Sequence, residues 1–227
     1  MFGLDDKIAS FSDGTTIAIV IVVSMLLGLR HASDPDHLAA VTTLVASGKE
    51  RAARAAGRLG LAWGLGHATS LFVFGLPVVL YSAYLPKPVQ SAAETSVGFV
   101  IVALAALLLV RWRRGMYRDD RHSHRPLRNV KQAYAIGVVH GMGGTAGVGL
   151  LLLAAIRSHV LAVAALALFA FCTSLSMALL STGWGAALGS RPVRRSFNRI
   201  APALGAASLA FGVWYALGAQ GVVPYVF

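Results

Sequence analysis

The sequence from residue 15 to residue 46 reads TTIAIVIVVSMLLGLRHASDPDHLAAVTTLVA. It is apolar on both sides of a charged stretch at residues 30–37. A straight helix of this length would measure roughly 50 Å, whereas the hydrocarbon core of a bilayer is about 30 Å thick. Pro35 lacks a backbone donor and disfavours helical geometry at Asp34. We therefore expect a long first membrane helix that is broken at Asp34-Pro35.

Further apolar segments of about bilayer length follow along the chain. They cover residues 59–81, 92–112, 133–156, 160–182 and 200–219. Of the 227 residues 56% are hydrophobic and only 13% are charged, whereas a soluble domain carries about 25% charged residues. The sequence therefore predicts an all-α integral membrane protein with six transmembrane helices, which form a single transmembrane domain over residues 1–227.

Basic residues gather in alternate connections between these segments. The connections after the first, third and fifth segments hold 16 of the 20 lysines and arginines. Because basic loops prefer the cytoplasmic side, we expect a multi-pass protein of the cell inner (cytoplasmic) membrane with both termini outside. The net charge of +11 does not indicate nucleic-acid binding, because aromatic residues are not interleaved with the basic ones as a stacking surface would require.

Two short matches indicate an internal repeat. Gly28-x-x-His31 matches Gly137-x-x-His140, and ATSL at 68–71 matches TSL within CTSL at 172–175, with offsets of 109 and 104 residues. These matches predict a 3+3 inverted repeat with halves 15–112 and 133–219, joined by a basic cytoplasmic loop at 113–132. The alternative is chance similarity between segments rich in Ala, Gly and Leu.

Ionisable side chains inside a membrane are costly and are functional candidates by default. Within the predicted segments they are Arg30, His31, Asp34, Asp36, His37, His67 and His140. On one helix, His31, Asp34 and His37 would share one side, and Asp36 would point toward Arg30 or orient an imidazole. The last three histidines lie nine to twelve residues from a basic residue at the cytoplasmic end, so we expect them near the bilayer midplane.

This set of donors predicts a site for a divalent transition metal. Neutral imidazole suits nickel, copper, zinc and iron, whereas magnesium and calcium prefer oxygen ligands. We predict as metal-binding residues His31, Asp34, Asp36, His37, His67 and His140. The alternative is structural: the charged groups pair with one another, and the more distant histidines only support helix packing.

Three classes of function fit such a site. No phosphate-binding loop occurs in the sequence, which favours a secondary transporter, without a cofactor, over an ATPase. An intramembrane metal-dependent hydrolase would need a general base, and the Glu of a His-Glu-x-x-His motif is absent, so we do not expect an enzyme. A membrane metal chaperone or sensor that binds without translocation, a metal exporter, and assembly as a homo-oligomer remain open.

The polar motifs resemble those of a known family. Residues 30–37 contain the His-x4-Asp-His pattern of the nickel/cobalt transporter family, and Gly66-His67 resembles its second motif. Residues 139–144 (VHGMGG) are similar to the shorter, six-span nickel permeases associated with urease accessory genes, and the Gly-Phe-Asp-Thr-like signature of eight-span members is absent. The resemblance implies a permease with Ni²⁺ or Co²⁺ as its transported substrate, handled by His31, Asp36, His37 and His67.

Overall fold

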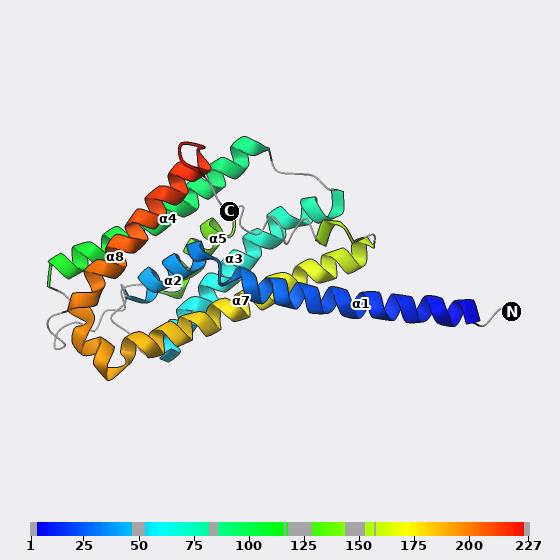
Figure 1. The fold of residues 1–227 in the computed structure, drawn as a ribbon, viewed down its shortest axis with the longest axis horizontal. Helices are drawn as coiled ribbons and strands as arrows, with labels where there is room; N and C mark the ends of the chain where they lie inside the picture. Colours follow the sequence, from blue (N-terminus) through cyan, green and yellow to red (C-terminus); the bar gives the residue numbers. More distant parts are fainter. Residues whose placement is uncertain are drawn as a thin grey trace.

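The structure is a computed structural model of the chain. It describes residues 4–46, 53–81, 86–115, 117, 129–143, 153–156 and 158–224, with the backbone alone for 4–16, 194 and 195. The described residues form helices and connecting turns, without strands (Figure 1). The helices are α1 (Leu4–His31), α2 (Pro35–Ala46), α3 (Ala53–Tyr81), α4 (Lys87–Arg113), α5 (Val130–His140), α7 (His159–Gly189) and α8 (Arg191–Ala219).

The first membrane segment is broken where the sequence predicts it. Helix α1 ends at His31, α2 begins at Pro35, and the two helices meet at 53°. The backbone N–H groups of Ser33 and Asp34 donate to carbonyls of the last turn of α1, which closes that helix. Proline is well tolerated at the first position of α2, because the backbone donor it lacks has no partner there.

Two antiparallel helix pairs form the body of the bundle. Helices α3 and α7 lie side by side, with Gly64 against Ser174 and Gly60 against Ser181. Helices α4 and α8 form the second pair, at the upper left of Figure 1. Helix α1 lies against α7, and α2 packs between the two pairs, in contact with α4, α7 and α8.

Helix α5 is short and lies against α3. It begins with a capping box in which the Asn129 side chain accepts a hydrogen bond from the Gln132 backbone and the Gln132 side chain accepts one from the Asn129 backbone. It ends at His140, after 11 residues. The predicted fourth span, 133–156, is therefore not one continuous helix, and its residues 144–152 lie outside the described part of the chain.

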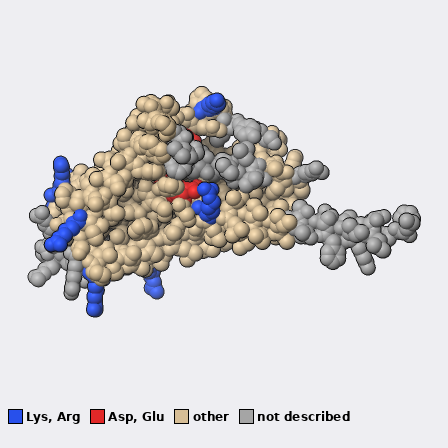
Figure 2. All heavy atoms as spheres, viewed as in Figure 1, with Lys and Arg blue, Asp and Glu red and all other residues tan. Residues whose placement is uncertain are grey.

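Four helices are long and apolar enough to cross a membrane, and the bent pair adds a fifth if it counts as one span. The part of the chain that the structure describes thus supports a multi-pass, all-helical membrane protein, without confirming six spans. Most of the predicted loop 113–132 falls outside the described residues. On the face drawn in Figure 2, most of the lysines and arginines lie toward the end of the bundle where α7 ends and α8 begins.

The distribution of polar side chains is that of a protein surrounded by lipid. Large apolar side chains such as Phe99, Phe171 and Leu179 are more than 60% exposed. Buried polar groups line the contacts between helices, and Thr173 and Ser174 donate to carbonyls on α7 or on α3. In a bilayer the exterior needs no polar groups, whereas each polar group inside needs a partner within the protein.

Candidate metal site

The break between α1 and α2 lies beside α3 and α5, and four histidines meet there. His31 is the last residue of α1, His37 lies in the first turn of α2, His67 is in the middle of α3, and His140 is the last residue of α5. On a straight helix His31 and His37 would be about 9 Å apart along the axis. The 53° bend instead brings their ring centroids to 4.7 Å.

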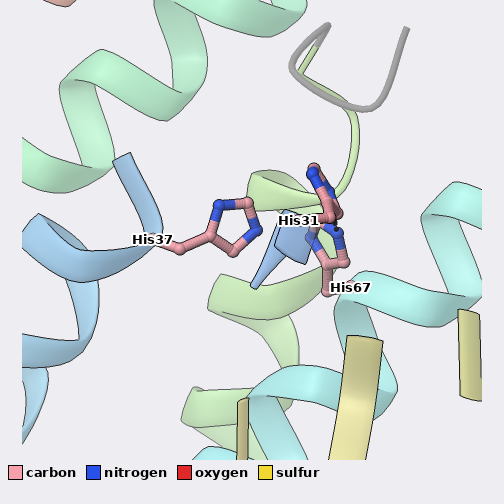
Figure 3. A group of neighbouring side chains, drawn as sticks. All are labelled: His31, His37 and His67. Atoms are coloured by element: carbon pink, nitrogen blue, oxygen red, sulfur yellow. Dashed lines mark hydrogen bonds between the residues drawn. The ribbon is translucent and has the colours of Figure 1, made fainter. Parts of the chain in front are cut away.

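His37 is the central ring of the group. Its centroid is 4.9 Å from that of His67 and 4.5 Å from that of His140. Figure 3 shows it facing His31 and His67, which lie close together on the opposite side. The Nε2 atoms of those two histidines are 3.1 Å apart. All four histidines are at most 4% exposed.

Two carboxylates fix the orientation of two of these rings. Asp34 Oδ2 lies 3.0 Å from His31 Nδ1, and Asp36 Oδ1 lies 3.0 Å from His37 Nδ1. An ionised carboxylate only accepts hydrogen bonds, so each Nδ1 donates and each Nε2 keeps its lone pair. This is the usual arrangement of a metal-binding histidine, with a carboxylate behind the ring.

Asp36 also faces a third histidine. Its Oδ2 atom is 3.2 Å from His140 Nε2, and its side chain is almost fully buried. The other carboxylate is more open, because Asp34 is 12% exposed and has the 72% exposed Arg30 at 3.7 Å. A contact of that kind contributes little in water, so Arg30 offsets little of the charge of Asp34.

The cluster contains ring nitrogens without a hydrogen-bond partner among the described residues. Among the described residues, His37 Nε2 and His67 Nδ1 are buried and make no hydrogen bond. Leaving such atoms unpaired costs free energy, so they indicate a site whose ligand is a metal or a polar group. Two sets of donors lie close enough to hold one ion each, with ligand atoms within 4.8 Å of one another: His31, His37 and His67; and Asp36, His37 and His140.

Glycines explain why two of the histidines reach the cluster. An added Cβ on Gly141 would lie 2.5 Å from the His67 carbonyl oxygen, and one on Gly137 would lie 2.9 Å from the His67 nitrogen. Only helices without side chains at the contact can approach this closely. The Gly-His pattern of the sequence therefore positions backbone as well as supplying an imidazole.

All six residues predicted from the sequence lie in or beside this cluster, and whether they bind metal stays a prediction. Sequence reasoning missed two aromatic walls. The Trp63 ring lies 5.8 Å from His37 and 5.4 Å from His140, and the Phe169 ring lies 5.7 Å from His31. The spacing of Trp63, one helical turn before His67, was the available signal.

Comparison with known proteins agrees with the motifs. The family model described as high-affinity nickel-transport protein (NicO) matches residues 17–144. The chain is also 26% identical over 216 residues to urease accessory protein UreH of Bacillus sp. (strain TB-90), covering 89% of this chain and 92% of that protein. No solved structure matches the chain. The resemblance read from the motifs is thus confirmed, as is the expectation of a transporter rather than an enzyme: the protein belongs to the family of high-affinity nickel-transport proteins.

Proposed function

We propose that the protein is a nickel permease, a secondary transporter that moves the ion across the cell inner membrane through the cluster of four histidines and two aspartates. The observation that supports this most directly is the buried pair of carboxylate-oriented rings, Asp34–His31 and Asp36–His37, inside a bundle with an apolar exterior. Buried groups of this kind are expensive in a membrane and mark ion pathways.

The donor set fits nickel as the substrate. It offers imidazole nitrogens and carboxylate oxygens, and the one cysteine of the chain, Cys172, belongs to neither donor group. Divalent nickel and cobalt both accept these ligands, and selectivity between them depends on geometry rather than on ligand type. Cobalt is therefore the informative competitor in any test.

We further propose that the two halves form an inverted repeat around the cluster. Gly28 of α1 approaches Phe169 O and Thr173 N of α7, and Gly137 of α5 approaches Trp63 O and His67 N of α3. In the two contacts Phe169 O corresponds to Trp63 O, and Thr173 N corresponds to His67 N. The offset between corresponding residues is 109 from α1 to α5 and 106 from α3 to α7.

Side-chain hydrogen bonds repeat with the same offsets. Ser176 donates to Leu29 O at 3.2 Å, and Ser70 donates to Val138 O at 2.6 Å. The offset of 106 residues in this proposal is two more than the offset of the sequence match between residues 68–71 and 172–175. In this alignment of the halves, His31 corresponds to His140.

The α4–α8 pair supports the same relation. Gly98 of α4 faces Ala216 N of α8, and Gly212 of α8 faces Val102 N of α4. The corresponding residues of the two helices are 114 positions apart in both contacts. Because equivalent helices run antiparallel, the halves would have opposite orientations in the membrane, as alternating-access transporters with a midplane site do. The ion would then be released when one half rocks against the other.

We propose that both termini lie outside. In support, the start of α3, the end of α4 and the start of α8 carry exposed basic residues at one end of the bundle, which the positive-inside rule assigns to the cytoplasm. These residues are Arg54, Arg58, Arg113, Arg114, Arg191 and Arg199.

The test is uptake of radioactive nickel by cells that express the chain, with and without excess cobalt. A His37→Ala variant should lose uptake, and His159→Ala, an exposed histidine at the start of α7, is the matched control. Membrane insertion of each variant is verified beforehand. Lower accumulation than in cells without the protein would indicate an exporter, and binding without flux would indicate a chaperone; either result would reject the permease.

A further inference from the structure

We propose that the transported ion occupies two successive positions that share His37. The outer position is formed by His31, His37 and His67, and the inner position by Asp36, His37 and His140. The inference rests on the proposed transport function and adds a route through the site: the ion passes from a position with three imidazoles to one with two imidazoles and a carboxylate.

The donor atoms divide into these two groups in the structure itself. Among the described residues, no group of close donors contains both His67 and His140, whose ring centroids are 6.0 Å apart. His37 belongs to both groups, with centroid distances of 4.9 Å and 4.5 Å to those two rings. The side chains are therefore not arranged to hold a single ion with all four histidines.

The two nitrogens of His37 face different partners. Nδ1 lies 3.0 Å from Asp36 Oδ1, on the side of the inner position. Nε2 is buried and has no partner among the described residues, and Figure 3 shows a ring nitrogen of His37 directed toward His31 and His67. The ring can thus bind an ion in the outer position through Nε2 and one in the inner position through Nδ1, without rotating.

Trp63 indicates the order of the two positions along the pathway. Its ring contacts His37 and His140, both in the inner group, and it precedes His67 of the outer group by one turn of α3. Helix α3 starts at the basic end of the bundle, with Arg54 and Arg58 exposed in its first turns. The inner position is therefore assigned to the side of the cluster that Trp63 borders, toward that end.

A shared imidazole makes the positions mutually exclusive. A neutral ring has one lone pair, so His37 binds through Nε2 when Nδ1 carries the proton, and through Nδ1 when Nε2 carries it. As the ion moves inward the ring changes tautomer: one water molecule takes the proton from Nδ1 and another gives a proton to Nε2, so neither the ring nor the solvent gains net charge. The protein should therefore bind one nickel ion, although it has two positions.

The experiment measures binding and flux on the purified full-length chain in lipid nanodiscs and proteoliposomes. Equilibrium dialysis gives the number of Ni²⁺ ions bound, and the absorption spectrum of Co²⁺ reports the ligands around the ion. We expect one ion in the wild type, one in His67→Ala, one in His140→Ala and none in His37→Ala. The two single variants should give different Co²⁺ spectra, and nickel flux should fall at least about tenfold in each.

The controls separate a lost position from a lost fold. His67→Gln and His140→Gln keep more of the side-chain volume and should behave as the alanine variants do, whereas His159→Ala should bind and transport as the wild type. Loss of all binding in both His67 and His140 variants would overturn the proposal in favour of one composite site, and two ions in the wild type would overturn the sharing of His37. Unchanged flux in His140→Ala would remove the inner position from the pathway.

Failure of the proposed function has a different signature. If wild-type proteoliposomes accumulate no nickel, the permease is rejected, while the ion counts and spectra of the same variants still decide whether two positions share His37.

Discussion

Adding one methyl group at Gly141 should displace the backbone that carries His67. An alanine Cβ there would lie 2.5 Å from His67 O, 2.9 Å from its Cα and 3.0 Å from its carbonyl carbon. Contacts between such atoms need roughly 3.5 Å, so α3 and α5 must separate by about 0.5–1 Å. The backbone at Gly141 has φ of −73°, which alanine adopts without strain, so the effect of the substitution comes from this contact.

That displacement is large for a binding site. Ligands must be held within about 0.5 Å of their working geometry, and overpacking of this kind costs about 1–3 kcal/mol. Since 1.4 kcal/mol is a factor of ten, nickel affinity of Gly141→Ala should fall roughly tenfold, with a comparable loss of uptake at low nickel concentration.

The assay is nickel binding by dialysis beside radioactive uptake, with Gly183→Ala as the matched control. Gly183 lies within α7, where an added Cβ would meet nothing within 4 Å, so this variant should behave as the wild type. Gly141→Ala with wild-type affinity and uptake would refute the idea that the α3–α5 contact sets the position of His67.

Further predictions concern the charged residues of the cluster, the Trp63 ring beside it and the effect of pH. Asp36→Asn removes the acceptor behind His37 and should weaken nickel binding about 10–100-fold in dialysis; equal binding would deny Asp36 an orienting role. Arg30→Gln should change affinity no more than about fivefold, because its contact with Asp34 is exposed and long. Trp63→Ala should destabilise the fold by about 3–5 kcal/mol and lower the melting temperature, whereas Trp63→Phe should keep most of that stability. Nickel binding should decrease as pH falls from about 7.5 to 5.5, because protonated imidazole has no lone pair. The measurement is equilibrium dialysis at each pH, and an affinity that does not change with pH would exclude histidine ligands.

The broken helix was predictable because proline acts locally. Pro35 determines the end of one helix and the start of another from its own covalent structure, so no knowledge of neighbouring helices is needed. Residue counting also predicts a common depth for His67 and His140, and this stays a prediction. Their contact partners could not be predicted, because these depend on how closely α3 and α5 approach at Gly137 and Gly141.

The span count shows a limit of hydropathy. Residues 133–156 are apolar enough for a membrane helix, yet α5 ends at His140. Hydropathy measures the length of an apolar run, whereas helix continuity depends on backbone propensity, and Gly141 and Gly143 follow that last residue. The 3+3 repeat stays a proposal: the identical letters at 69–71 and 173–175 give an offset of 104 residues, whereas the glycine contacts of α3 and α7 match at 106.

The ends of α1 and α5 give the cluster an electrostatic character of their own. Each helix terminates at a histidine, His31 or His140, and thus directs the carbonyl end of its backbone at the cluster. A helix C-terminus carries a partial negative charge of about half an electron, which attracts cations. The start of α2 carries the opposite, positive partial charge, and the carboxylate of Asp36 in its first turn offsets that charge. The backbone therefore favours a cation at this level even while every imidazole is neutral, and that attraction would persist after any single histidine is replaced.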